Sequence, residues 1–267
     1  MLSGVMAAHA VRPQNAAVRA YRLEGARGIS ATLSHYSPLT RLSAHEHGFT
    51  QISFLLAGEM RESLGRNDFD LGGPSHGCKP AGHSHSNEYG KPGALIFAVN
   101  LGDEGEERAV RQASGWGSTA AGKDVPSLVR VVLEAADPSL RAELLWDLVA
   151  LEREEEHPRR SPPPVWLEQI RGEIRDAPDL MRIDAASQTA GVHRTRISRL
   201  FRRHYGVPPS VYRLRCMAAK GIAFALASEG KLVEAAYDVG FSDQSHLART
   251  VKACTGLPLQ RLKSLLG

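Results

Sequence analysis

Cysteine is scarce in this sequence, and no two cysteines have the spacing of a metal-binding or redox motif. Cys78, Cys216 and Cys254 lie far apart in a chain of 267 residues. This pattern argues against a disulfide framework and is typical of a reducing cytoplasm. No apolar run approaches the roughly 18 residues that a membrane-spanning helix needs. The start, MLSGVMAAHAVRPQ, lacks the basic and apolar segments of a signal peptide. We therefore expect a cytoplasmic protein without a membrane partner.

Net charge is also small, at +4, but it is unevenly distributed. Residues 165–267 hold 16 Lys and Arg against 9 Asp and Glu, a balance of +7, and the rest of the chain carries −3. A polyanionic partner is therefore expected for the C-terminal part only. The length and the hydrophobic content of 42% suit a globular chain with two domains.

The N-terminal part has the pattern of short strands separated by turns that contain Gly, Pro and Asn. Strands are predicted at residues 29–36, 51–56, 59–64 and 94–101. Short strands at regular spacing predict a sandwich or a barrel. Residues 71–92 are rich in Gly, Pro and His, and this composition predicts loops.

The period becomes helical from Asp124 onward. One apolar face contains Val129, Val132 and Leu133, and Asp137-Pro138 separates this helix from the next. The second helix has a face of Leu140, Leu144, Leu145, Leu148 and Leu151. This face could cover the barrel or form a homodimer seam, and we favour the seam. The Pro-rich run at 158–164 predicts a stiff linker.

Everything after the linker reads as helix. Helices are predicted at residues 164–175, 182–190, 194–205, 208–228, 232–239, 243–255 and 258–266, with glycines where left-handed caps are needed. The expected boundaries are 18–123 for an N-terminal domain of strands, 124–157 for a helical dimerisation or packing segment, 158–164 for the linker and 165–267 for a C-terminal helical domain.

The segment IDAASQTAGVHRTRISRLFRRHYG predicts a helix-turn-helix unit, whose second helix can lie in the major groove of DNA. Ile183 and Ala186 are expected to face inward, and Gly191 makes the turn. The second helix is expected to be anchored by Ile197, Leu200 and Phe201 and to expose Arg194, Thr195, Arg196, Ser198, Arg199, Arg202 and Arg203. These side chains suit base reading and phosphate contact, although a solvated basic face on a packing helix is an alternative.

A second unit, LVEAAYDVGFSDQSHLARTVKACTG, repeats this design later in the chain. Val233 and Ala236 are expected to pack inward, Gly240 makes the turn, and Ser242 or Asp243 caps the second helix. The long helix between the units could hold the two reading helices in successive major-groove faces, roughly 34 Å apart. The second reading helix exposes Gln244, Ser245, His246, Arg249 and Lys252.

The runs RISRLFRRHYGVPPSVYRLRCMAAK and EAAYDVGFSDQSHLARTVKACTGLPLQRLK resemble the DNA-binding domain of the AraC/XylS family of transcription regulators. The resemblance covers about 100 residues. It implies base-facing roles for Thr195, Ser198 and Arg199 on the first reading helix, and for Gln244, Ser245, His246 and Arg249 on the second. Adding the neighbouring cationic side chains, the predicted DNA-binding set also contains Arg194, Arg196, Arg203 and Lys252.

The chain departs from that family's pattern at several positions. His193 stands where the family usually has a Ser or Thr cap, and the loss of this cap is expected to weaken the first reading helix by roughly 1 kcal/mol. Leu247 and Val251 replace an aromatic pair, and Leu262 replaces a late Tyr. These three changes are apolar and are expected to preserve packing.

The pieces HEHGFTQ at residues 45–51 and PAGHSHSN at 80–87 resemble a cupin barrel, which the same family often carries before its DNA-binding domain. The resemblance places His45, His47 and His85 at the metal-ligand positions, with Gln51 at the position of the usual Glu. This set would suit a single Zn, Fe, Ni or Cu ion. Barrels of this kind also occur without metal, and His76 and His83 read as solvated loop histidines.

The expected fold class is therefore α+β with two domains: an N-terminal cupin-like β-barrel with following helices, and a C-terminal all-α double helix-turn-helix domain. The expected function is a DNA-binding transcription regulator that responds to a small-molecule or metal effector and is not an enzyme. The resemblance implies an activator, because activation is the more common mode in that family. Expected partners are double-stranded promoter DNA, the effector, RNA polymerase and a second copy of the chain.

Three alternatives remain. A metal-dependent cupin enzyme fused to a DNA-binding domain is disfavoured by Gln51 and by the lack of an obvious acid/base pair nearby, and a DNA-repair methyltransferase by the scattered cysteines. A constitutive DNA binder without an effector would leave the barrel without a purpose.

Overall fold

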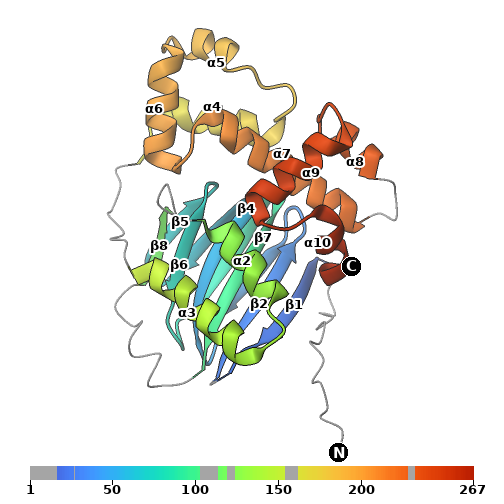
Figure 1. Ribbon diagram of the computed structural model, residues 1–267. Helices are drawn as coiled ribbons and strands as arrows, with labels where there is room; N and C mark the ends of the chain where they lie inside the picture. Colours follow the sequence, from blue (N-terminus) through green and yellow to red (C-terminus); the bar gives the residue numbers. More distant parts are fainter. Residues whose placement is uncertain (1–16, 27, 103–113, 119–123, 154–161, 228–231) are drawn as a thin grey trace, which may run out of the picture.

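The computed structural model describes residues 17–26, 28–102, 114–118, 124–153, 162–227 and 232–267. Strands form the first part of the chain and helices form the rest, so the α+β class is confirmed (Figure 1). Two helices cover one face of the sheet, and the C-terminal helices lie against one end of it (Figure 1). No described helix is long and apolar enough to cross a membrane.

The N-terminal region is a single antiparallel sheet. Its main path has the order β1-β2-β7-β4-β6-β8, with β3 added to β7 and β5 added to β4. The strands are β1 Val18–Glu24, β2 Ile29–Tyr36, β3 Arg41–His45, β4 Thr50–Leu64, β5 Asn67–Leu71, β6 Ser75–Lys79, β7 His85–Leu101 and β8 Gly115–Ser118.

The two long strands, β4 and β7, bend where their glycines meet. Gly58 and Gly93 both have positive φ, at 85° and 73°, and β4 has register shifts on either side of Gly58. A Cβ atom on Gly58 would lie 1.9 Å from the carbonyl oxygen of Gly93, so no other residue fits there. The bend lets one half of each strand pair with β2 and β6 and the other half with β3 and β5.

Two strand predictions need correction. The strands predicted at 51–56 and 59–64 are one continuous strand, because the Gly58 turn signal marks a bulge rather than a chain reversal. The loop prediction for 71–92 is wrong, because this stretch contains β6 and the first part of β7. His76 is consequently not a solvated loop residue: it is buried in β6 opposite Phe54.

Helices α2 (Val125–Glu134) and α3 (Pro138–Arg153) cover the outer face of the sheet (Figure 1). Asp124 and Asp137 cap them by accepting hydrogen bonds from first-turn backbone N–H groups. Leu145 and Leu148 of α3 are fully buried in the same apolar core as the sheet residues. Leu145 and Leu148 therefore pack on the sheet and are not available for a homodimer seam, whereas Leu140 of the same face is 48% exposed.

The C-terminal helices begin and end within two residues of the predicted positions. They are α4 Val165–Asp176, α5 Ile183–Ala190, α6 Arg194–Tyr205, α7 Pro209–Ala227, α8 Leu232–Asp238, α9 Gln244–Thr255 and α10 Leu259–Leu266. Left-handed glycines follow α5, α6 and α9 as predicted. The predicted linker lies largely outside the described residues; Pro162–Pro164 lead directly into α4.

The two helix-turn-helix units are packed differently. The first has a core of its own, formed by α4, α5, α6 and the start of α7, with Phe201 and Tyr212 at its centre. The second shares one continuous core with the sheet, α2 and α3, in which Ile222 of α7 and Val251 of α9 take part. The second unit is therefore held by the N-terminal region more extensively than the first.

An ion pair network around the buried Arg171 joins the first unit to the sheet. Arg171 of α4, 3% exposed, lies 2.6 Å from Asp70 of β5 and 3.5 Å from Glu59 of β4. Its Nε donates to the Tyr212 hydroxyl at 3.2 Å, and its guanidinium carbon stacks over the Tyr205 ring at 5.0 Å. We call this group the Arg171 junction.

The Glu59 carboxyl of this junction predicts a pH dependence. Burial raises its pKa from 4.5 to about 7, against the attraction of Arg171 and Arg175. The folded protein thus holds this proton more tightly than the unfolded chain, so the contribution to stability is complete below pH 4.5 and is lost as pH rises through about 7. We expect this loss to be about 3 kcal/mol.

Urea unfolding at pH 5, 6, 7 and 8 measures the effect. The pH dependence of the Glu59→Gln variant, subtracted from that of the unchanged protein, isolates this carboxyl from the histidines that titrate in the same range. Glu88→Gln, at an exposed position on β7, is the matched control and should leave the dependence unchanged. Equal pH dependences for Glu59→Gln and the unchanged protein would contradict the assignment.

Candidate DNA interface and polar cavity

The first helix-turn-helix unit has the predicted inward and outward faces. Ala186, Ile197 and Phe201 are buried, and Gly191 makes the turn at φ 64°. Of the predicted outward residues, Ser198 is half-buried and lines a groove, and the others are exposed: Arg194, Thr195, Arg196, Arg199, Arg202 and Arg203. The helix thus presents a row of cationic side chains that anionic DNA can meet.

The absent cap on this helix is a wrong prediction. His193 is the N-cap residue, and its Nδ1 accepts a hydrogen bond from the backbone N–H of Thr195 at 3.3 Å. The imidazole nitrogen thereby accepts the N-cap hydrogen bond that a Ser or Thr hydroxyl usually accepts. This hydrogen bond offsets part of the expected loss of roughly 1 kcal/mol in helix stability. It does not offset all of the loss, because the bond is long and therefore weak.

The second unit is capped as predicted. Asp243 accepts a hydrogen bond from the backbone N–H of His246 at 2.7 Å and one from the Ser242 hydroxyl at 3.1 Å. These bonds hold the pKa of the Asp243 carboxyl below its usual value, the backbone bond most strongly. Leu247, Val251 and Leu262 are fully buried, so the apolar replacements preserve packing as expected.

The predicted reading face of α9 is largely available. Gln244, Ser245, Arg249 and Lys252 are exposed. His246 is only half-exposed, because its ring lies edge-on against Phe241 at 5.0 Å and its Nδ1 lies 3.4 Å from the Ser242 hydroxyl. The inward prediction for Ala236 is confirmed, whereas the side chain of Val233 lies outside the described residues.

Helix α7 joins the two units and has 19 residues, which corresponds to roughly 28 Å of helix. This length is close to one turn of B-DNA, as expected for a helix that joins two reading helices, and the placement of these helices in successive major-groove faces stays a prediction. Arg199 and Arg249 occupy equivalent places, because each is the sixth residue of its helix.

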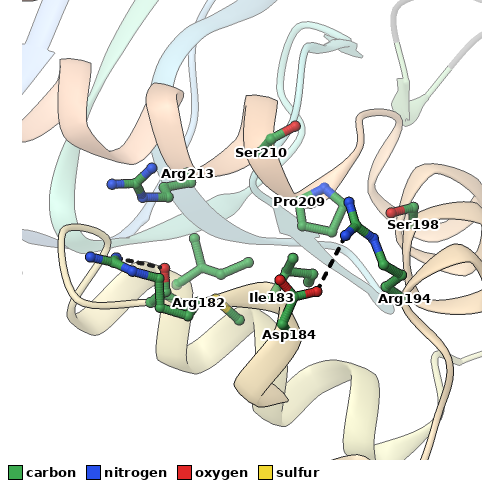
Figure 2. A pocket seen from close by; sticks show the side chains of 10 residues that line it. Arg182, Ile183, Asp184, Arg194, Ser198, Pro209, Ser210 and Arg213 are labelled. Atoms are coloured by element: carbon green, nitrogen blue, oxygen red, sulfur yellow. Dashed lines mark hydrogen bonds and ion pairs between the residues drawn. The ribbon is translucent and has the colours of Figure 1, made fainter. Parts of the chain in front are cut away.

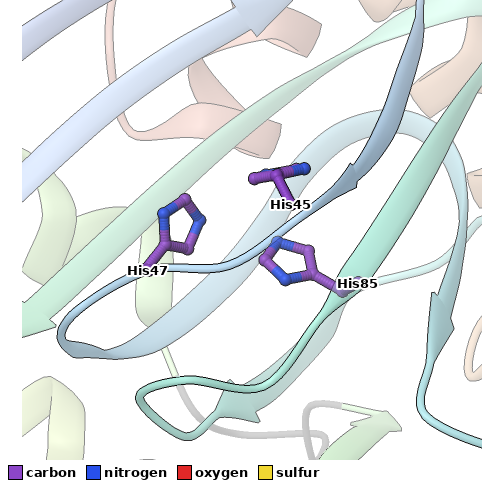
Figure 3. A group of neighbouring side chains, drawn as sticks. All are labelled: His45, His47 and His85. Atoms are coloured by element: carbon purple, nitrogen blue, oxygen red, sulfur yellow. The ribbon is translucent and has the colours of Figure 1, made fainter.

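The second candidate site is a polar cavity of about 180 Å³ in the sheet. Three of its histidines, His45, His47 and His85, point toward one another from β3, the loop after it and the start of β7 (Figure 3). One ligand nitrogen from each lies within 4.8 Å of the others, and the ring centroids are 4.3–5.1 Å apart. The convergence expected from the HEH and HSH motifs is therefore present.

The donor chemistry of this histidine cluster fits a transition metal. Nδ1 of His45 lies 2.9 Å from the Ser43 carbonyl and Nδ1 of His85 lies 3.2 Å from the His83 carbonyl, which orients both rings. Burial lowers the pKa of His47 to about 4 and also lowers the pKa of His85. Neutral imidazoles at pH 7 are the form that binds a metal.

Gln51, the fourth predicted ligand, lines the same cavity from β4. Its amide nitrogen donates to Asn100 Oδ1 at 3.0 Å, and its amide oxygen accepts from the Ser53 hydroxyl at 3.3 Å. These bonds make Gln51 part of a polar wall beside the histidine cluster. Its role as a ligand stays a prediction.

Sequence reasoning missed a buried acidic and basic pair in this cavity. Glu62 of β4 is fully buried and lies 3.3 Å from the ammonium group of Lys79 on β6. Burial acts to raise the pKa of Glu62, but Lys79 and the hydrogen bonds from Trp116 and Asn87, both 2.7 Å, outweigh it and lower the pKa. The available signal was strand alternation, since Met60, Glu62 and Leu64 share one face.

Comparison with known proteins assigns the C-terminal part of the chain. Residues 186–264 match a family model described as a helix-turn-helix domain. No curated protein matches this chain.

Solved structures similar to the N-terminal part include an oxalate decarboxylase variant from Bacillus subtilis, at 15% identity and a TM-score of 0.32, covering 35% of this chain and 27% of that one. A second is KdgF from Halomonas sp., at 14% identity and a TM-score of 0.31, covering 37% and 92%. A third is a cupin superfamily protein from Desulfitobacterium hafniense, at 16% identity and a TM-score of 0.31, covering 35% and 84%. The chain thus spans about a quarter of the length of the oxalate decarboxylase.

Proposed function

We propose that this chain, whose residues 186–264 are an AraC-type helix-turn-helix domain, is a transcription regulator that binds promoter DNA in response to an effector. The observation that carries the proposal is the pair of capped reading helices, α6 and α9, joined by α7 and exposing Arg199 and Arg249 at equivalent places. Thr195, Ser198 and Gln244 to His246 are the remaining base-facing candidates, and Arg203 and Lys252 lie farther along for phosphate contact.

Selection from a pool of randomised duplex DNA with the full chain tests this function. We expect one enriched sequence with two conserved half-sites, whose centres lie about 10 base pairs apart because the reading helices meet the same side of the duplex. Footprinting on the enriched duplex should protect both halves. The absence of any enriched sequence at low salt, with the protein folded, would contradict the proposal.

The polar cavity is proposed as the effector site. Its volume admits a small molecule only, and its lining supplies hydrogen-bond donors and acceptors from β2, β4, β6 and β7. A single Zn, Fe, Ni or Cu ion on His45, His47 and His85, with Gln51 beside them, would supply an electrophilic centre for an oxygen-bearing effector.

Metal analysis tests the histidine cluster. Protein purified without chelator and without a His-tag should retain roughly one equivalent of transition metal, and its melting temperature should fall on chelation because the metal binds the folded state. His47→Ala should lose both the metal and the chelator effect. His83→Ala is the control, because His83 is exposed and lies outside the cluster. The metal site would be refuted if the purified protein contained no metal and its melting temperature did not change when metal was added.

One observation bears on the alternative of a cupin enzyme: the Glu62–Lys79 pair is a candidate acid/base pair in the same cavity as the histidine cluster. The carboxylate of Glu62 already accepts from Lys79, Asn87 and Trp116, so it is engaged in joining β4 to residues of three other strands, β6, β7 and β8. A general base needs a lone pair that substrate can reach. We therefore propose that the chain is not an enzyme; turnover by metal-loaded protein would overturn this.

The remaining parts of the proposal follow from the family resemblance. The chain is proposed to act in the cytoplasm as an activator that contacts RNA polymerase, and to do so as a homodimer. Because Leu145 and Leu148 pack on the sheet, the dimer contact must lie on another surface than the buried face of α3. Sedimentation of the free protein and of its DNA complex measures the stoichiometry.

A further inference from the structure

A groove of about 510 Å³ lies beside the first reading helix. It is formed where the chain leaves α4 and where α5, α6 and α7 begin, and Figure 2 shows its arginines on opposite sides of the opening. Arg182 and Arg213 lie on one side, and Arg194 with Ser198 lies on the other (Figure 2). The groove is thus continuous with the predicted base-reading residues.

The charge of the groove is positive. Three arginines line it against a single carboxylate, that of Asp184. Asp184 lies 3.4 Å from Arg194, but both side chains are mostly exposed, so this ion pair is weak and can open. Among the residues that the structure describes, Arg182 donates only to backbone carbonyls, those of Asp179 and Met181, which leave its charge uncompensated.

Arg213 is the best-positioned of the three. It is half-buried, and its Nε donates to the carbonyl oxygen of Pro178, which fixes the plane of the guanidinium group. Within the described part of the chain its Nη groups have no acceptor, so they remain available for an anion. An arginine fixed in this way suits bidentate contact with a phosphate.

The groove is also lined by apolar side chains, those of Ile174, Met181 and Ile183. In a nucleic-acid backbone, charged phosphates alternate with less polar sugars. A groove that combines arginines with apolar side chains therefore suits a sugar-phosphate chain. The first turns of α5, α6 and α7 also line the groove, and the positive ends of helix dipoles add to the arginine charge. From these observations, and resting on the proposed function, we infer that the groove holds the backbone of the duplex that α6 reads, with Arg182 and Arg213 as phosphate clamps.

Salt titration of DNA binding by the full chain tests this inference. Removing one bound phosphate from the interface should reduce the slope of log K against log salt by about 0.9. Arg182→Gln and Arg213→Gln should each lower that slope accordingly and weaken binding to the selected duplex and to random duplex by the same factor. Arg213→Lys keeps the charge and should restore the slope.

Arg41→Gln is the matched control, because Arg41 is an exposed arginine on the sheet that pairs with Glu88. Melting temperatures near that of the unchanged protein establish that each variant is folded. If the unchanged protein binds DNA and both groove variants behave like Arg41→Gln, the phosphate clamp is refuted while the regulator function stands. If the unchanged protein binds no DNA, both fall.

Isothermal titration separates DNA backbone from a free anion as the occupant. Inorganic phosphate and a mononucleotide should bind the free protein too weakly to measure. Tight binding of either one that Arg213→Gln abolishes, with DNA binding unaffected, would make the groove a small-anion site and overturn the inference.

Discussion

Replacing Arg171 with alanine is expected to lower the free energy of unfolding by about 3–5 kcal/mol, because it leaves the buried Glu59 carboxyl without its nearest cationic partner. Arg171 is 3% exposed and reaches Asp70 and Glu59 on the sheet while its Nε bonds Tyr212 in the first helix-turn-helix unit. No other ion pair in the described part of the chain joins this unit to the sheet at comparable burial. Urea unfolding monitored by tryptophan fluorescence measures the loss.

The stability lost in Arg171→Ala should depend on pH, because its main cause is the unpaired Glu59 carboxyl, which titrates. Without Arg171, Glu59 can take up a proton, and its pKa of about 7 should rise further. Arg171→Ala should therefore cost less at pH 5 than at pH 8. Arg130→Ala, which removes an exposed pair with Glu134 on α2, should cost under about 1 kcal/mol at both pH values. An Arg171→Ala loss as small as that of the control would show that the junction contributes nothing to stability.

Local periodicity was enough to predict the helices. The apolar spacing and the cap residues placed α4 to α10 within two residues, because helix hydrogen bonds and caps involve neighbours in the sequence. The turns at Gly191 and Gly240 were predictable for the same reason, since only glycine readily adopts the positive φ found there.

The sheet was harder to predict, because its strands are defined by partners far away in the chain. Residues 75–79 carry a Gly and a Cys between polar residues, yet they form β6 because β4 and β8 supply hydrogen-bond partners on both sides. The reverse error occurred at Gly58, where a local turn signal is overridden by the pairing of β4 with β7.

The candidate sites show the same difference between local sequence signals and long-range contacts. The histidine cluster and the reading helices were predictable from short motifs. Glu62, Lys79 and Asn87 were not, because their contacts join residues that lie 17 and 25 positions apart in a folded sheet. The Arg171 junction joins residues 101 positions apart in the case of Asp70, and no spacing rule in a single sequence connects them.

Arg199→Ala and Arg249→Ala are expected to separate base reading from simple attraction. Both arginines are exposed at the sixth position of their helices, on the side opposite the buried anchors Phe201 and Leu247. An arginine at such a place can bond guanine bidentately, a contact worth roughly 1–3 kcal/mol of discrimination. Each variant should therefore lose about 5- to 150-fold in affinity for the selected duplex and much less for random duplex.

The position of each effect in the site adds a second readout. Arg199→Ala should relax sequence preference in one half-site and Arg249→Ala in the other, as measured by repeating the selection with each variant. Lys252→Ala is the control on the same helix as Arg249, because Lys252 lies nearly one turn farther along and is expected to meet phosphate. It should weaken selected and random duplex together and flatten the salt slope. Equal losses on selected and random duplex for a folded Arg199→Ala would instead show that α6 contributes only a basic face.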